Sequence, residues 1–230
     1  MRLDKFICKS TELTRTEAKK LLKKGEVTVN GQVVKDPATQ VHENNEIKLF
    51  ERVLETRQSR YIMMNKPADT ICSNVDETYP SLLHYIELDK AFDLHIAGRL
   101  DADTTGLVLI TDDGRWSHNI ISPKKNCEKV YRVWLRDEIA EDVADKFLTG
   151  VQLQGEKALT RPAKLEIVSE KEVLLTITEG KYHQVKRMFA AVYNKVVKLH
   201  REQIGAIKLD DTLSPGEWRH LTEKEMSEFS

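Results

Sequence analysis

The chain has 230 residues, of which 40% are hydrophobic and 32% are charged, and its formal net charge is −1. This composition is typical of a globular protein with one large or two modest domains, and it excludes a disordered or fibrous chain. No apolar run approaches the roughly 18 residues that a membrane span requires, and the N-terminus lacks the apolar segment of a signal peptide. The three cysteines are widely separated and lack metal-ligand spacing, so we expect reduced thiols in a cytoplasmic protein.

The near-neutral net charge conceals two basic segments. Residues 1–35 contain nine Lys or Arg and four Asp or Glu, whereas residues 181–201 contain six Lys or Arg and no acidic residue. Two such segments on one chain are consistent with an extended track for a polyanion. Solvated helix faces explain either segment about as well when it is taken alone.

The first 50 residues have the pattern of a small module that begins with two helices. Leu3, Phe6 and Ile7 have helical spacing. Residues 14–17 read Thr-Arg-Thr-Glu, a capping box that predicts the start of a second helix, and Gly25 is placed to end it. The second helix carries basic residues at most of its other positions, so much of its exposed surface is expected to be positive.

A hairpin is predicted next, because the alternating β-formers of residues 27–34 surround Asn30-Gly31 and both turn residues tolerate positive φ. A basic helix pair beside such a hairpin resembles the S4 RNA-binding module, and Pro37 and a strand region over 41–47 extend the match. Its motifs here are Arg2-Leu3-Asp4-Lys5, Thr14-Arg15 with Ala18 and Leu21, and Val27-Thr28-Val29-Asn30-Gly31. The resemblance implies contacts to RNA phosphates, which position a protein without specifying sequence. The residues carried over are Arg2, Lys5, Arg15, Lys19, Lys23 and Lys24.

Residues 51–60 mix charges without a helical or strand period, so we interpret them as a linker and expect domains at 1–58 and 59–230. In the second domain the fold class we predict is α+β with a mixed, mainly antiparallel sheet, because strands and helices interleave while several strands are close in sequence. The expected strands are 61–64, 107–111, 128–136 and 172–178, and the expected helices lie near 80–87, 115–121, 138–149 and 183–193.

A polar, glycine-bracketed loop at residues 97–106 leads directly into the apolar strand predicted at 107–111. A loop in this position holds its side chains on a rigid element, and it contains Arg99, Asp101 and Asp103. A carboxylate there can act as nucleophile, general base or ion-pair partner. Most acidic loops are solvated turns, however, so the loop by itself does not establish catalysis.

Two further segments belong with this loop. Residues 128–133 place Tyr131 among basic residues on a strand, and residues 179–188 are a glycine-led entry into an amphipathic helix with a basic first half. Together the three segments resemble the RNA pseudouridine synthases. The motifs that carry the resemblance are Gly98-Arg99-Leu100-Asp101 with Thr104-Thr105-Gly106-Leu107, Thr111-Asp112-Asp113-Gly114, Asn65-Lys66-Pro67, Lys129-Val130-Tyr131-Arg132 and Gly180-Lys181-Tyr182-His183-Gln184-Val185-Lys186-Arg187-Met188.

The resemblance implies that the protein isomerises uridine: the bond from sugar C1′ to uracil N1 breaks, the base turns, and C5 is joined to the sugar. Because nothing is oxidised and no group is lost, this reaction requires no metal or redox cofactor. Asp101 matches the family's catalytic aspartate, which either forms a covalent adduct or assists departure of the base. Tyr131 matches its active-site tyrosine, which offers a stacking surface to a flipped base, although a lone tyrosine on a strand is more often a core residue.

Lys186 aligns with the basic residue that pairs with the catalytic aspartate, and we prefer it to Arg187 because helix neighbours face different ways. A cation within about 4–6 Å keeps a partly buried carboxylate ionised, but Lys lacks the bidentate geometry of Arg. Arg187 is expected to reach phosphate, and Arg99 either fills the gap left by the flipped nucleotide or holds its phosphate. Asp103 is expected to organise the loop, and His183 to be a hydrogen bonder at the helix start without a role in proton transfer.

We therefore expect site-specific modification of small-subunit (16S) ribosomal RNA, either naked or within an assembling particle, by a monomer without a membrane partner. The S4 module and a basic helix over 181–201 would grip the RNA, with strongly salt-dependent binding. The alternative is a non-catalytic S4-containing RNA-binding or ribosome-assembly protein, but binding alone does not require a carboxylate that faces a polyanion. Hydrolysis of a glycosidic bond would need two carboxylates at a defined separation, which no sequence feature shows.

Overall fold

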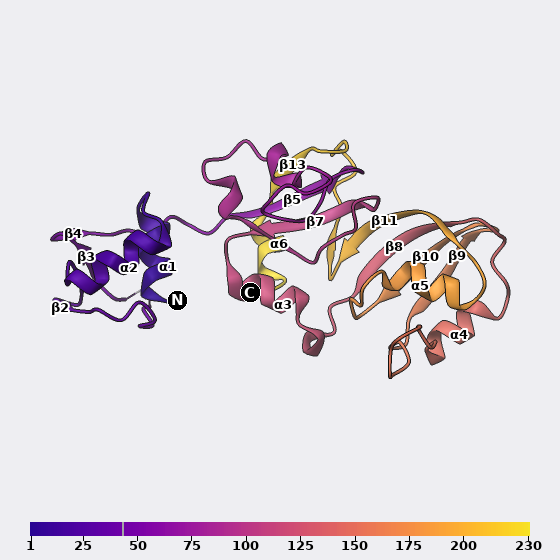
Figure 1. The fold of residues 1–230 in the computed structure, drawn as a ribbon. Coiled ribbons are helices and arrows are strands. Elements are labelled where there is room, and N and C mark those ends of the chain that lie inside the picture. Colours follow the sequence, from indigo (N-terminus) through magenta and orange to yellow (C-terminus); the bar gives the residue numbers. More distant parts are fainter. Residues whose placement is uncertain (43) are drawn as a thin grey trace. The chain divides into compact units, whose positions relative to one another are not determined.

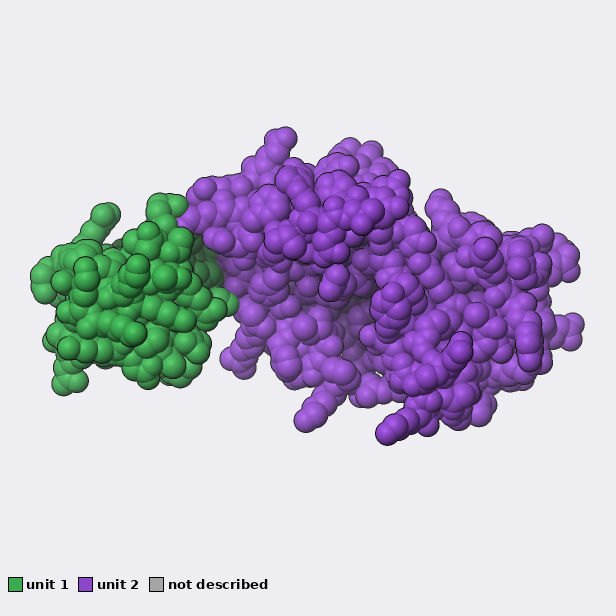
Figure 2. Space-filling model, in the orientation of Figure 1, with its two compact units in different colours: residues 1–58 green, residues 59–230 purple. Residues whose placement is uncertain are grey.

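The computed structural model describes residues 1–42 and 44–230. The chain forms two compact units, Met1–Gln58 and Ser59–Ser230, which are coloured separately in Figure 2. Each unit has its own sheet; buried apolar side chains form one cluster in the first unit and two in the second.

The first unit packs two helices against a small antiparallel sheet in the order β2-β1-β3-β4. Thr14 and Glu17 form the predicted reciprocal capping box, and Gly25 ends the second helix in the left-handed conformation at φ 82°. The hairpin around Asn30-Gly31 is also confirmed, since Val29 pairs with Gln32. The elements are α1 Leu3–Ser10, α2 Arg15–Lys24, β1 Val27–Val29, β2 Gln32–Val33, β3 Ile47–Leu49 and β4 Arg52–Val53.

Two sequence-based expectations for this unit are corrected. Strand β3 begins only at Ile47, so residues 41, 42 and 44–46 of the strand predicted over 41–47 are not strand, and residue 43 lies outside the described residues. Residues 52 and 53, in the expected linker, form β4 and pair with Leu49 and Lys48. A two-residue strand is too short for alternation to be recognised in a sequence.

Asp4 is a buried carboxylate at the start of α1, and two arginines hold it. Its side chain is fully buried and accepts hydrogen bonds from Arg2 Nε at 3.0 Å and from Arg15 Nε at 3.2 Å. Burial by itself raises the pKa of Asp4, but the hydrogen bonds from the two arginines outweigh this effect, and the pKa is lowered. Both arginines, which we predict to contact RNA, therefore also have a structural contact inside the unit.

Asp4→Asn is expected to destabilise the first unit by about 1.5–3 kcal/mol, because it weakens hydrogen bonds to a charged group. Since the pKa of Asp4 is lowered on folding, its stabilisation is fully present above the unfolded value of 3.8 and is lost as the pH falls through the folded value. Hydrogen exchange of the α1 and α2 amides in the full chain measures this difference. The difference from wild type should shrink in acid, and a pH-independent difference would contradict an ionised Asp4. Glu26→Gln, which removes an exposed carboxylate from the same unit, is the control.

The second unit is built on a nine-stranded sheet whose main path runs β13-β5-β7-β11-β8-β10-β9, with β6 added to β7 and β12 to β11 (Figure 1). Across residues 59–230 every strand pairing is antiparallel except that of β7 with β11. The predicted mixed, mainly antiparallel sheet is thus confirmed. The strands are β5 Tyr61–Lys66, β6 His95–Ala97, β7 Thr105–Thr111, β8 Lys129–Leu135, β9 Lys164–Ser169, β10 Glu172–Ile177, β11 Val196–Ile204, β12 Ile207–Lys208 and β13 Trp218–His220.

Helices cover both faces of this sheet. On one face α4 and α5 lie along the β8, β10 and β9 part (Figure 1). The rings of Phe147 and Phe189, from these two helices, meet edge to face with centroids 5.1 Å apart. On the other face Trp116 of α3 packs against Phe229, the second residue after the end of α6. The helices are α3 Gly114–Ile121, α4 Val143–Thr149, α5 Gln184–Ala191 and α6 Glu223–Ser227, and short 3-10 turns occur at η1 Leu82–Tyr85, η2 Ala91–Asp93 and η3 Pro123–Lys125.

Several predicted helices are shorter in the structure. The helix expected near 80–87 is only the turn η1, α4 begins at residue 143 rather than 138, and α5 ends at residue 191. The basic stretch 181–201 is therefore a turn, a helix and most of a strand rather than one helix, because β11 begins at residue 196. Within residues 1–42 and 44–230, no helix is both long and apolar enough to span a membrane.

Candidate active site

The loop that carries Asp101 connects β6 to β7, and the buried amine of Lys66 holds it. Lys66 Nζ donates to the backbone carbonyls of Pro67, Ala102 and Thr104 at 3.0, 3.2 and 2.8 Å. Burial lowers the pKa of this amine. Two of these carbonyls, those of Ala102 and Thr104, belong to the backbone immediately after Asp101, so Lys66 ties this part of the loop to β5.

Asp101 lies in a cluster formed by the loop and the start of α5. Lys186 Nζ donates to Asp101 Oδ2 at 3.2 Å and to Asp103 Oδ1 at 2.7 Å. His183 Nε2, from the residue before α5, lies 3.5 Å from Asp101 Oδ1. The Asp101 side chain is 33% exposed, so the carboxylate is reachable from solvent. The structure thus brings together two of the three residues to which we assigned catalysis.

The charges in this cluster stabilise one another. Burial acts to lower the pKa of Lys186, but the hydrogen bond to Asp103 and the charge of Asp101 outweigh it and raise the pKa. Burial acts to raise the pKa of Asp103, but the hydrogen bond from Lys186 outweighs it, and the pKa is lowered. Lys186 is therefore protonated at neutral pH and presents a cation to Asp101.

Tyr131 lies on β8 and is linked to the Asp101 loop through Arg201 of β11. The ring of Tyr131 is 7% exposed, and its hydroxyl accepts a hydrogen bond from Arg201 Nη1 at 3.3 Å. Arg201 is 1% exposed and also donates to the carbonyls of Gly98 at 2.7 Å and Leu107 at 2.9 Å. One buried guanidinium therefore ties Tyr131 to both ends of the loop that carries Asp101.

The backbone of Arg201 approaches the same loop closely at Gly106. Gly106 has φ +106°, and a Cβ placed there would lie 2.3 Å from the carbonyl oxygen of Arg201. Only glycine fits this contact. The parallel pairing of β7 with β11, in which Gly106 is opposite Arg201, depends on that absence of a side chain.

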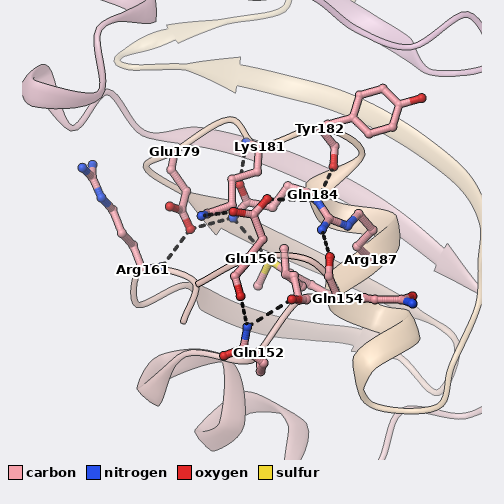
Figure 3. A network of polar contacts seen from close by, with 11 residues as sticks. Gln152, Gln154, Glu156, Arg161, Glu179, Lys181, Tyr182, Gln184 and Arg187 are labelled. Atoms are coloured by element: carbon pink, nitrogen blue, oxygen red, sulfur yellow. Dashed lines mark hydrogen bonds and ion pairs between the residues drawn. The ribbon is translucent and has the colours of Figure 1, made fainter. Parts of the chain in front are cut away.

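The turn before α5 is held by the polar network drawn in Figure 3. Arg187 donates to the carbonyls of Tyr182 at 3.0 Å and Gln154 at 2.6 Å. Glu156 accepts from Lys181 Nζ at 3.0 Å and contacts Arg187 at 3.4 Å. The pKa of Glu156 is lowered, chiefly by the hydrogen bond from Lys181 and despite burial. The network fixes the segment that delivers His183 and Lys186 to Asp101.

The residues predicted to contact RNA occupy different settings. Lys19, Lys23 and Lys24 are exposed on α2, and Arg99 is exposed on the Asp101 loop. Lys5 is half-buried on α1. Arg2 and Arg15 bind Asp4, and Arg187 is part of the network before α5. A phosphate contact by any of these three arginines would add to an existing internal contact.

Three residues of the site were not singled out from the sequence as positioning groups. Arg201 was counted only within a basic segment, although Leu199 and Arg201 share one face of a strand by their spacing, which is a signal for burial. Lys66 was noted only as part of a motif, and its burial under the loop depends on the pairing of β5 with β7. His183 was assigned to the helix start and not to Asp101.

An open cavity of about 650 Å³ lies at a different place on the same sheet. It is lined by Val130, His200, Glu202 and other residues, and it includes none of Asp101, Tyr131 or Lys186. Because Val130 and Tyr131 are adjacent on β8, they point to opposite faces of the sheet. Among the described residues, no group of three or more His, Cys, Asp or Glu side chains is arranged to hold a metal ion.

Comparison with known proteins finds relatives for both units. Residues 60–191 match the RNA pseudouridylate synthase family, and residues 1–47 match the S4 domain. Ribosomal small subunit pseudouridine synthase A of Vibrio cholerae is 56% identical over 227 residues, which cover 99% of this chain and 98% of that protein. The protein of the same name from Escherichia coli is 49% identical over 228 residues and 99% of each chain.

A solved structure agrees with these matches. A crystal structure of a pseudouridylate synthase has a TM-score of 0.75 to this chain with 48% sequence identity, and all of both chains is covered. An S4 domain followed by a catalytic domain on a mixed sheet is the architecture that the matches and the fold define together. The chain belongs to the RNA pseudouridylate synthase family and is an RNA pseudouridine synthase.

Proposed function

We propose that this enzyme converts one specific uridine of small-subunit (16S) ribosomal RNA into pseudouridine, with Asp101 as its catalytic carboxylate. The observation that carries the proposal is the contact of Lys186 Nζ with Asp101 Oδ2 at 3.2 Å on an accessible loop. The relatives named for the ribosomal small subunit support the choice of RNA, since they match over nearly their full lengths.

In the proposed reaction the C1′–N1 bond breaks, the uracil turns, and a C1′–C5 bond forms while C5 loses a proton and N1 gains one. Asp101 acts at the anomeric carbon, where positive charge develops as the base departs. Lys186 Nζ holds Oδ2 and presents a positive charge to the carboxylate. Oδ1, with its longer 3.5 Å contact to His183, is the oxygen that we assign to the sugar.

Tyr131 is proposed to form the wall against which the flipped uracil packs. Its hydroxyl oxygen accepts from Arg201, so the phenolic proton takes no part in that contact and can be passed on as the oxygen receives the proton from C5. A target base inside folded RNA must leave its stack before it can reach such a site.

RNA binding is assigned to the first unit, residues 1–58, and catalysis to residues 59–230. The exposed lysines of α2, Lys19, Lys23 and Lys24, are suited to phosphate contacts, and Arg99 lies on the same loop as Asp101. Lys5, Arg2, Arg15 and Arg187 complete the proposed RNA-binding set. We propose a monomer that acts in the cytoplasm on ribosomal RNA, either naked or in an assembling particle.

Tritium release tests the proposal, because the label at uridine C5 enters water only when C5 loses its proton. We expect the enzyme to release one equivalent of tritium per molecule of small-subunit ribosomal RNA labelled at uridine C5, and none from large-subunit RNA. Equal release from both RNAs would contradict the proposed specificity. Absence of release from either RNA, and from assembling small-subunit particles, would contradict the proposed reaction.

A further inference from the structure

An exposed aromatic pair lies at the edge of the Asp101 site. The rings of Tyr182 and His183 are stacked, with centroids 3.8 Å apart and planes inclined by 22°. Tyr182 is 76% exposed. His183 is in turn 3.5 Å from Asp101. A π-face open to solvent is thus connected to the carboxylate through a single intervening side chain.

The backbone of this pair is held firmly. His183 has φ 48° and ψ 36°, a left-handed conformation that is uncommon for a residue with a side chain. Gln184 N donates to the carbonyl of Lys181 at 3.1 Å, and Arg187 donates to the carbonyl of Tyr182 at 3.0 Å. A less favourable backbone conformation that the surroundings over-determine is a feature of ligand-binding sites.

The ring of Tyr182 points away from the polar network that holds its backbone. Figure 3 shows its ring projecting away from the network, while its carbonyl faces Arg187. One face of the ring is covered by His183, and the high exposure of Tyr182 leaves the other available. Base stacking on such a surface is tolerant of sequence, because every base has a π-face.

Tyr182 and Tyr131 differ in burial and in position. Tyr131 is buried, fixed by Arg201 and part of the sheet, whereas Tyr182 stands outside the site beyond His183. When the sugar of the target uridine is at Asp101, only the side chain of His183 lies between that position and the ring of Tyr182. We propose that Tyr182, braced by His183, stacks on the base of the nucleotide next to the target uridine. This inference rests on the proposed reaction at Asp101.

The test compares Tyr182→Ala with Tyr193→Ala. Tyr193 is a suitable control because it is 92% exposed and follows the other end of α5, two residues after Ala191. Tritium release from labelled small-subunit ribosomal RNA gives kcat and KM, and filter binding of the same RNA gives Kd. We expect Tyr182→Ala to raise KM and Kd about tenfold with kcat unchanged. Tyr182→Phe and Tyr182→Trp should retain wild-type values, because stacking uses the ring and not the hydroxyl.

RNA fragments that lack a single base show which neighbouring nucleotide Tyr182 contacts. Once the modified uridine is mapped, fragments that lack the base on its 5′ or 3′ side are bound to wild type and Tyr182→Ala. For one of the two fragments, the tenfold difference in Kd between wild type and Tyr182→Ala should disappear. The inference is wrong if Tyr182→Ala behaves like Tyr193→Ala, if Tyr182→Phe is as weak as Tyr182→Ala, or if neither fragment removes the difference. Failure of wild type to release tritium would instead contradict the proposed reaction, and the binding measurements would still decide whether Tyr182 stacks on RNA.

Discussion

Asp101→Asn is expected to lower the rate of tritium release from small-subunit ribosomal RNA by at least about 1000-fold, as for other enzymes that lose a central catalytic group. The amide has nearly the shape of the carboxylate but cannot carry the negative charge required at C1′. Affinity for RNA should be kept or slightly increased, because a negative charge is removed from a site that binds a polyanion. Single-turnover tritium release and filter binding measure the two effects separately.

Asp103→Asn is the matched control for this substitution. Asp103 is on the same loop and shares Lys186 Nζ with Asp101, but it is the more exposed of the two carboxylates. Asp103→Asn should lower the rate of tritium release by less than about tenfold. This is the order of effect expected when a neighbouring hydrogen bond is weakened by about 1 kcal/mol. Full activity of Asp101→Asn, or an equal loss in both variants, would remove Asp101 from the mechanism.

Lys186→Met should lower the rate about 100-fold, the typical effect of removing one preorganised group that stabilises charge in an active site. Methionine is about as long as lysine but cannot donate to Asp101 or Asp103. The two carboxylates then lack the cation that holds and aims them. Rates at saturating RNA, measured by tritium release, show the loss in the chemical steps rather than in binding.

Lys186→Arg and Lys157→Met separate position from net charge. Arginine keeps the cation at this place, so Lys186→Arg should retain activity within about tenfold of wild type. Lys157 is exposed on the loop that packs against the turn before α5, and its removal changes the same net charge without touching Asp101. Equal losses in Lys157→Met and Lys186→Met would show that the effect is one of overall charge.

The local elements of the fold were accessible from the sequence. The capping box at Thr14, the stop at Gly25 and the turn at Asn30-Gly31 are determined by residues within four positions of one another, so short-range rules predict them. The limits of α4 and α5 were not predicted well, and β11 was missed. Strand β11 has buried neighbours on both sides, β7 and β8, that are distant in sequence.

The residues of the site likewise divide into those that the sequence predicted and those that it did not. Asp101, Tyr131 and Lys186 were selected by motif, and the contact between Asp101 and Lys186 agrees with that selection in space. The supporting groups were not selected, since the burial of Lys66 under the loop and of Arg201 beside Tyr131 follows from strand pairings. The stacking of Tyr182 on His183 depends on a left-handed residue that no propensity indicated.

The sequence alone determined the family, the order of an S4 module and a catalytic domain, and the chemical groups available for catalysis. Motifs and periodicity depend on residues that are close together in the sequence, so they can be recognised without a structure. Only the tertiary structure decided that His183 lies beside Asp101, that the guanidinium of Arg201 holds Tyr131, and that the ring of Tyr182 is open to solvent. Those contacts join residues about 70 to 100 positions apart, such as Lys186 with Asp101 and Arg201 with Gly98, and only the packing of β7, β8, β11 and α5 brings them together.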